Sequence, residues 1–318
     1  MRYFIFNYET DNHLIDSFLI SAAKAHGYSE VHSKEWFYWK FRDNPYGESI
    51  LACAEENGVI VGCVGYGRQL FLLNGKMLNA VLSFETFVHP DFQGHGLFTK
   101  LIKLAETKLI EQNIDFILNF PNNNSLKGFF KNGWKQIDPP EYRIRFNNYC
   151  KVLFKIWDIR KGYEPNKTNL SELVPFNQFE QYDLDCFHSK LSLDYLNWRF
   201  FTFPVTEYIV LKNDNYQSIM KMGKRGTVRE AHVLFINIKD WKLLKLKDFL
   251  QHCKKNASFD IISFTVSNNN PLKNILMKNM FIKVPSKVHM CYKILNQKAV
   301  TDVDFTNISF DGVNHHTN

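Results

Sequence analysis

The sequence lacks several features that would place it in a specialised class of protein. Its six cysteines include no CxxC pair, which argues against a zinc site and against a disulfide framework. No segment approaches 18 uninterrupted apolar residues, and residues 1–8 contain no basic region followed by a long apolar stretch. We therefore expect a cytoplasmic protein that is not inserted in a membrane and uses no metal.

Charge of one sign is also not concentrated anywhere. The net charge of +7 is scattered, with no run of five or six like charges of the kind that binds nucleic acid. It indicates either a mild preference for anionic small molecules or simple solubility. Apolar residues make up 45% of the 318 positions, so the chain can bury the core of two domains or of one large domain.

An internal duplication is the first positive signal. A Trp lies six positions before a Pro in two similar aromatic stretches, Tyr38-Trp39-Lys40-Phe41-Arg42 before Pro45 and Asn197-Trp198-Arg199-Phe200-Phe201 before Pro204. Each stretch is followed by an apolar run and a turn signal, Asn57-Gly58 or Asn213-Asp214-Asn215, before a second apolar run. This order predicts a helix and then a hairpin in each half.

Further matches follow in the same order. Residues 122–134 begin with Asn-Asn-Asn-Ser-Leu-Lys and end in Gly-Trp, while residues 268–281 begin with Asn-Asn-Asn-Pro-Leu-Lys and end in Met-Phe. Together the matches predict two copies of one α/β unit. The join should fall near Lys161 to Ser171, where Gly162, Pro165 and polar residues cluster.

The most informative segment combines a strand, a glycine loop and a helix. Residues 80–88 form a mostly apolar run that His89-Pro90 ends, and Gln93-Gly94-His95-Gly96 then precedes apolar positions at Leu97, Leu101, Leu104, Ala105 and Leu109. The first N–H groups of such a helix are unpaired and favour an anion, best a phosphate. A dinucleotide-binding loop would need a third glycine, which is missing.

The stretch Val88-x-Pro90-x-Phe92-Gln93-Gly94-x-Gly96-Leu97 resembles the pyrophosphate-binding signature of the GNAT superfamily of N-acyltransferases. Residues 122–134 resemble the second cofactor region of that family. The resemblance implies an α+β protein of two tandem GNAT-like domains, each a mixed, mostly antiparallel sheet flanked by helices. Residues 1–155 would bind acyl-CoA, residues 165–300 would form a degenerate second domain, and residues 301–318 would form a tail.

The same resemblance implies where acyl-CoA binds. Backbone amides from Gly94 to Phe98 would hold the pyrophosphate, and the strand edge near Phe87 and Val88 would pair with the pantetheine arm. The implied cofactor-binding residues are Phe87, Val88, Gln93, Gly94, His95, Gly96, Leu97, Phe98, Asn122, Asn124 and Phe130. For the Asn residues, capping of the following helix is an equal alternative.

For proton transfer, Glu85 is the favoured base, because a carboxylate on an apolar strand should have a raised pKa. Asn119 is a second candidate, as a polar partner of the acceptor or of the thioester carbonyl. His26, His32 and His188 could also act as bases, although a lone His is more often structural. Family members often have a Tyr where this chain has Phe130, so that acid is absent.

The second half has no glycine between Val228 and Asp240, where we place the equivalent loop, so we expect it not to bind coenzyme A. We expect the acceptor between the halves. The tandem architecture and the stretch from Trp39 to Gly47 resemble bacterial enzymes that acylate a dTDP-linked amino-dideoxyhexose, with acetyl or a larger group such as 3-hydroxybutanoyl, for lipopolysaccharide or capsule. The alternatives are an acyltransferase whose acceptor is a peptide or antibiotic amine, and a non-catalytic acyl-CoA-binding module.

Overall fold

The computed structural model describes residues 1–73, 75–147, 156–159, 161–166, 178–181, 187–202, 208–285, 288–301 and 303–309. It divides into two compact units. The first unit comprises Met1–Asp138 and Val288–Val303, and the second comprises Pro139–Lys287 and Asp304–Asn318. The predicted domain limits, residues 1–155 and 165–300, stay a prediction. The two compact units have other limits, because each contains a strand from the other half of the sequence. In the described residues, no helix is both long and apolar enough to cross a membrane.

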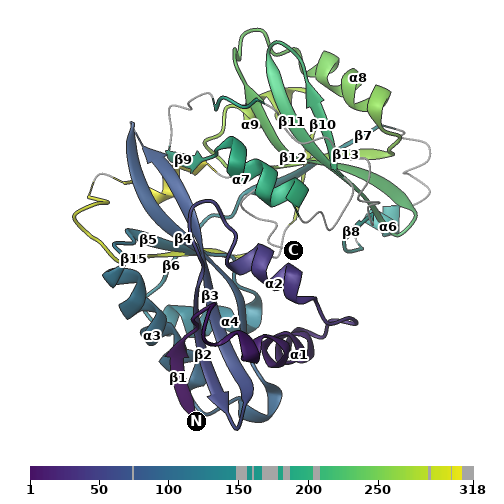
Figure 1. Ribbon diagram of the computed structural model, residues 1–318. Coiled ribbons are helices and arrows are strands. Elements are labelled where there is room, and N and C mark those ends of the chain that lie inside the picture. The colour runs from purple at the N-terminus through teal and green to yellow at the C-terminus, as the bar shows by residue number, and fades with distance from the viewer. Residues whose placement is uncertain are drawn as a thin grey trace. The chain divides into compact units, whose positions relative to one another are not determined.

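The first unit is a mixed sheet with helices on both faces (Figure 1). Its strands are β1 (Arg2–Ile5), β2 (Ile50–Glu56), β3 (Val59–Leu73), β4 (Lys76–Val88), β5 (Phe116–Asn119), β6 (Lys135–Ile137) and β15 (Met290–Ile294). Its helices are α1 (Ile15–His26), α2 (Lys34–Phe41), α3 (Leu97–Glu111) and α4 (Asn123–Lys131), with short helical turns η1 (Asn12–Leu14) and η2 (Pro90–Phe92). The strand order is β1-β2-β3-β4-β5-β15-β6. Within this order β4 and β5 are parallel, and the other neighbouring strands are antiparallel.

The second unit repeats this plan. Its strands are β7 (Glu141–Phe146), β8 (Glu164–Pro165), β9 (Phe187–Lys190), β10 (Tyr208–Lys212), β11 (Tyr216–Arg225), β12 (Val228–Ile238), β13 (Ile261–Val266), β14 (Ile282–Val284) and β16 (Ile308–Ser309). Its helices are α6 (Ile156–Ile159), α7 (Leu193–Asn197), η4 (Trp198–Thr202), α8 (Leu246–Asn256), α9 (Leu272–Lys278) and η5 (Phe305–Asn307). The sheet order is β10-β11-β12-β13-β7-β14, with only β12 and β13 in parallel.

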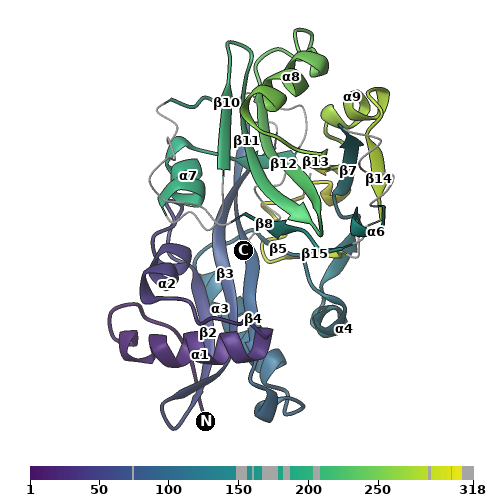
Figure 2. The ribbon, with the colours of Figure 1, turned by 90° about the vertical axis from the view of Figure 1, so that its right-hand side faces the viewer.

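The two sheets exchange one strand each. In the first unit β15, from the end of the sequence, lies between β5 and β6 (Figure 1). In the second unit β7, from the first half, lies between β13 and β14 (Figure 2). Each unit therefore depends on a strand that is distant in sequence.

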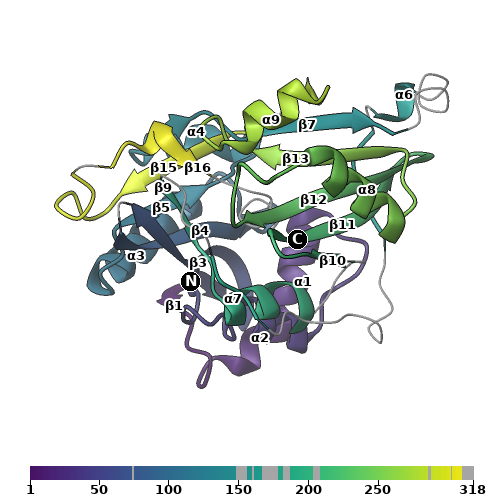
Figure 3. The ribbon, with the colours of Figure 1, turned by 90° about the horizontal axis from the view of Figure 1, so that it is seen from above.

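Two layers of side chains hold the first unit together. On one face α3 buries Leu97, Leu101, Ala105 and Leu109 at helical spacing, as predicted, against strand residues such as Val64. On the opposite face the rings of α1 and α2 pack on β4, because alternate residues of a strand point to opposite faces. In the second unit α8 and α9 share one apolar core on the sheet (Figure 3).

Several local predictions are confirmed. The β2–β3 hairpin turns at Asn57 and Gly58, which both have positive φ, as a type I′ turn requires. Both predicted Trp-containing helices form, as α2 and as α7 with η4. Pro204 and residues 167–171 of the predicted join lie outside the described residues. One placement is wrong: residues 228–238 form strand β12, so the loop equivalent to the glycine loop is 239–245, which also lacks glycine.

Candidate active site

A cavity of about 460 Å³ lies in the first unit beside the glycine loop. Its size falls in the range of small-molecule sites, which is roughly 300 to 1,000 Å³. The residues that line it are Ala25, His26, Thr86, Phe87, Val88, Phe92, Gln93, Gly94, Gly96, Leu97, Phe98, Asn122, Ser125 and Gly128. They come from the ends of α1 and β4, from the loop before α3, and from the starts of α3 and α4.

The glycine loop presents its backbone to this cavity. Gly94 and Gly96 have φ of 80° and 73°, a left-handed conformation that glycine adopts without the strain a Cβ brings. A Cβ added at either position would meet no atom within 4 Å, so the space beside both residues is open. Gly96 is also the N-cap of α3 and provides no side-chain cap. The first N–H groups of α3 are therefore available to an anion, at the positive end of the helix dipole.

Strand β4 separates from β5 where the cavity begins. Their parallel pairing covers Ala80 to Ser83 on β4 and Phe116 to Asn119 on β5. Two residues further along β4, a bulge places Glu85 and Thr86 opposite Val64 of β3. Glu85 has a φ of 43°, which is unusual for a residue other than glycine. The bulge aims the Glu85 side chain toward α1 and α2, while Thr86 lines the cavity.

The start of α4 closes the cavity on another side. The Asn122 side-chain oxygen accepts from the Ser125 backbone N–H at 3.0 Å, so Asn122 caps the helix and also lines the cavity. A Cβ on Gly128 would lie 2.7 Å from the Phe98 ring. Glycine at position 128 therefore lets the middle of α4 approach the start of α3 closely.

Glu85 is held by two cations or potential cations. Its Oε1 accepts a hydrogen bond from Lys40 Nζ at 2.6 Å, and His26 Nε2 lies 3.5 Å from Oε2. Burial raises the pKa of Glu85, but the charge of Lys40 and the contacts with His26 outweigh it and lower that pKa to about 2. The expectation of a raised pKa for Glu85 is therefore wrong. The ion pair with Lys40, which lowers this pKa, could not be inferred from the strand alone.

The structure brings most of the predicted cofactor residues together. Eight of the predicted cofactor residues line the cavity: Phe87, Val88, Gln93, Gly94, Gly96, Leu97, Phe98 and Asn122. His95 and Phe130 are not among the lining residues, and the Asn124 side chain lies outside the described part. Glu85 and Asn119 are buried and also do not line the cavity. Asn119 Nδ2 has no hydrogen-bond partner in the described chain.

Sequence reasoning missed two contributors to this region. Lys40 is the single charge in the run Trp36 to Phe41, and a Lys among buried aromatics needs an anionic partner, which could have indicated Glu85. Thr86 lines the cavity only because the bulge shifts the alternation of β4. A bulge of this kind leaves no signal in the local sequence.

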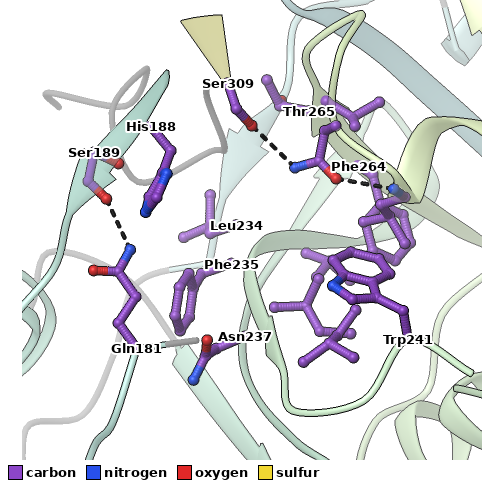
Figure 4. Close-up of a pocket in the computed structure, with 16 residues that line it drawn as sticks. Gln181, His188, Ser189, Leu234, Phe235, Asn237, Trp241, Phe264, Thr265 and Ser309 are labelled. Atoms are coloured by element: carbon purple, nitrogen blue, oxygen red, sulfur yellow. Dashed lines mark hydrogen bonds between the residues drawn. The ribbon is translucent and has the colours of Figure 1, made fainter. Parts of the chain in front are cut away.

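The equivalent place in the second unit is almost filled. The cavity there measures about 50 Å³ and lies at the end of β12 and the start of α9 (Figure 4). Segments from elsewhere in the unit occupy it: Gln181 Nε2 donates to the Ser189 carbonyl at 2.8 Å, and Asn270 Nδ2 donates to Ser309 Oγ at 3.3 Å. This volume is too small for a cofactor arm and suits one or two water molecules, at roughly 30 Å³ each.

Comparison with known proteins agrees with this architecture. Residues 9–134 match the model of the acetyltransferase (GNAT) family. No protein with a curated description matches the sequence. In the described residues, no group of His, Cys, Asp or Glu is arranged to hold a metal ion.

Solved structures resemble nearly the whole chain. A GCN5-related N-acetyltransferase from Anabaena variabilis is 11% identical, with a TM-score of 0.64 over 94% of this chain and 74% of that one. N-myristoyltransferase from Saccharomyces cerevisiae with bound myristoyl-CoA is 13% identical, with a TM-score of 0.53 over 93% of this chain and 82% of that one. A probable N-acyltransferase from Enterococcus faecalis is 10% identical, with a TM-score of 0.54 over 94% of this chain and 74% of that one. The chain therefore has a GNAT N-acyltransferase fold.

Proposed function

We propose that the protein transfers an acyl group from acyl-CoA to an amine, with the donor bound in the cavity of the first unit. The observation that carries this proposal is the glycine loop: two left-handed glycines with open space beside them, followed by an uncapped helix start. Such a backbone binds phosphate oxygens, and coenzyme A carries a pyrophosphate. The cavity then extends from the loop along the end of β4, beyond the residues that pair with β5, which suits an extended arm.

Each part of the cavity has a role in this proposal. Amides from Gly94 to Phe98 bind the pyrophosphate, and the β4 edge at Phe87 and Val88 bonds the pantetheine amides as another strand would. Thr86 Oγ1 is buried without a hydrogen-bond partner in the described chain, so it is suited to bond the same arm. Asn119 does not line the cavity, but its Nδ2 is buried and unpaired in the described chain, and we propose that it donates to the thioester carbonyl and stabilises the negative charge that develops there.

For the acceptor, we propose the amine of a dTDP-linked amino-dideoxyhexose used in lipopolysaccharide or capsule, with acetyl or 3-hydroxybutanoyl as the acyl group. The support is the resemblance of the stretch from Trp39 to Gly47, together with the net charge of +7. The narrow cavity of the second unit supports a role for that unit in acceptor binding rather than in binding a second coenzyme A. The buried thiols of Cys53 and Cys63 form no disulfide, which fits a reducing compartment, so we place the reaction in the cytoplasm.

A thiol-release assay tests the function. The purified chain is incubated with a grid of acyl-CoA donors against dTDP-amino sugars, peptide amines and aminoglycosides, and free coenzyme A is measured with a thiol reagent. Turnover in the dTDP-sugar column supports the full proposal. Turnover only with a peptide or antibiotic amine keeps the N-acyltransferase and rejects the sugar acceptor.

A calorimetric titration separates the remaining alternative. Coenzyme A binding without turnover on any amine would assign the chain as a non-catalytic binding module. A chain that binds no coenzyme A would reject the donor site itself.

A further inference from the structure

The wall of the cavity carries one ionisable side chain. Of the lining residues, all of them in the described part of the chain, only His26 can gain or lose a proton near neutral pH. It is the last residue of α1, which Gly27 ends in a left-handed conformation. The imidazole is therefore placed at the cavity by a helix end, while 27% of its side chain remains exposed.

Three neighbours fix the orientation of the His26 ring. Tyr28 stacks on it at 5.2 Å between ring centroids, and Phe87 meets it edge-on at 6.1 Å. The third neighbour is Glu85, whose Oε2 lies 3.5 Å from Nε2. When Nε2 carries the hydrogen and faces this carboxylate, Nδ1 is the nitrogen that accepts a proton.

The contact between Glu85 and His26 depends on a strained backbone. The positive φ of Glu85 belongs to the bulge in β4, and such conformations persist only where the surrounding structure enforces them. Lys40 anchors the other carboxylate oxygen. The bulge therefore holds a buried carboxylate against the one imidazole of the cavity, an arrangement that regular strand geometry would not give.

We infer that His26 is the catalytic residue that takes the proton from the acceptor amine, and that Glu85 is a positioning residue that orients His26. This inference rests on the proposed function. As the amine nitrogen bonds to the thioester carbon, the C–S bond breaks and coenzyme A leaves as a thiolate with the bonding electron pair. The proton of the amine passes to Nδ1 of His26, and the Glu85 carboxylate stabilises the imidazolium.

The other groups that face His26 are poor proton acceptors. The pKa of Glu85 is lowered to about 2 by Lys40 and His26 against the opposing effect of burial, so it holds a proton weakly. Burial and the charge of Glu85 raise the pKa of Tyr28 well above its ordinary value, so its hydroxyl stays neutral. Lys40 is charged and paired, and His32 stacks on Trp36 at 3.9 Å beyond Tyr28.

The test compares His26→Gln with a matched control, His13→Gln. His13 is exposed in η1 and does not line the cavity. We expect His26→Gln to lower kcat by about 100-fold or more, the usual contribution of a general base, with the dissociation constant for coenzyme A within about 2-fold of wild type. The rise of the rate with pH should also disappear. His13→Gln should match wild type in all three measurements.

A double variant tests the positioning role. Lys40→Met with Glu85→Gln removes the carboxylate without leaving Lys40 buried and unpaired. We expect about 10-fold lower kcat, with the KM for the amine and the coenzyme A affinity within about 2-fold of wild type, because only the orientation of the imidazole that takes the proton is lost. A kcat within about 3-fold of wild type would overturn the role of Glu85.

The outcomes separate this inference from the proposed function. A wild-type chain that releases no thiol from any donor and amine pair overturns both. An active wild type with His26→Gln within about 3-fold of it overturns the role of His26 alone. If His26→Gln is unstable, His26→Ala with added imidazole decides: restored turnover supports a chemical role, and its absence assigns the ring to packing and overturns the inference.

Discussion

Glu85 and Lys40 form an ion pair 2.6 Å long between β4 and α2, with 4% and 6% of their side chains exposed. The Lys40 ammonium also lies 4.5 Å from the centre of the Trp36 ring, so aromatic groups replace much of its water. A buried pair of this kind contributes little net stability, but loss of one partner leaves a buried charge unpaired. This contact links the helices of one face to the strand that carries the candidate site.

The first prediction concerns this pair. Glu85→Gln should lower the free energy of unfolding by about 3 to 5 kcal/mol, because Lys40 stays buried with its charge uncompensated. The double variant with Lys40→Met should recover most of that loss. Urea unfolding followed by circular dichroism measures all three proteins, and equal stabilities of the single and double variants would contradict the prediction.

The second prediction is the pH dependence of stability that arises from Glu85. Its pKa falls from an ordinary value of 4.5 to about 2 in the folded chain, so its contribution is fully present above pH 4.5 and is lost as the pH falls toward 2. The contribution is on the order of 3 kcal/mol. The unfolding free energy of wild type should therefore fall by this amount relative to that of the Lys40→Met, Glu85→Gln double variant across that window. Parallel pH curves would show that Glu85 titrates normally.

The third prediction concerns the glycine loop. Gly96→Ala places a Cβ in the open space beside the start of α3 and strains a backbone with φ of 73°. Gly75→Ala is a matched control, because Gly75 has a φ of 75° with nothing within 4 Å and lies in the β3–β4 turn. Both variants should lose about 1 kcal/mol of stability. Only Gly96→Ala should weaken coenzyme A binding, by about 10-fold or more in a calorimetric titration; equal affinities would place the donor elsewhere.

What the sequence predicts well in this chain is local. The strand–loop–helix of residues 80–109 can be inferred because apolar spacing, Pro90 and the glycines each act within a few residues. The aromatic helices and the Asn57-Gly58 hairpin follow for the same reason. Such signals define the loop of the donor site without any knowledge of tertiary contacts.

What the sequence does not predict depends on pairing between distant segments. The bulge at Glu85 exists only against Val64 of β3, and it decides both the pKa of Glu85 and its contact with His26. In the second unit, Ser309 reaches Asn270 from the end of the chain and narrows the cavity there. No local pattern marks either contact.

The exchanged strand β15 gives the last prediction. Its residues pair with β5 on one side, including Cys291 opposite Asn119, and with β6 on the other, including Met290 opposite Ile137. A chain that ends at residue 287 keeps every cavity residue but leaves both strands without their shared partner. Because Cys291 is fully buried in the core of the first unit, this truncation should abolish coenzyme A binding. A chain that ends at residue 303 is the control, because it retains β15 and, of the described elements, loses only η5 and β16, which belong to the second unit. It should bind coenzyme A as the full chain does in calorimetry, and binding by the shorter chain would show that the donor site forms without the exchanged strand.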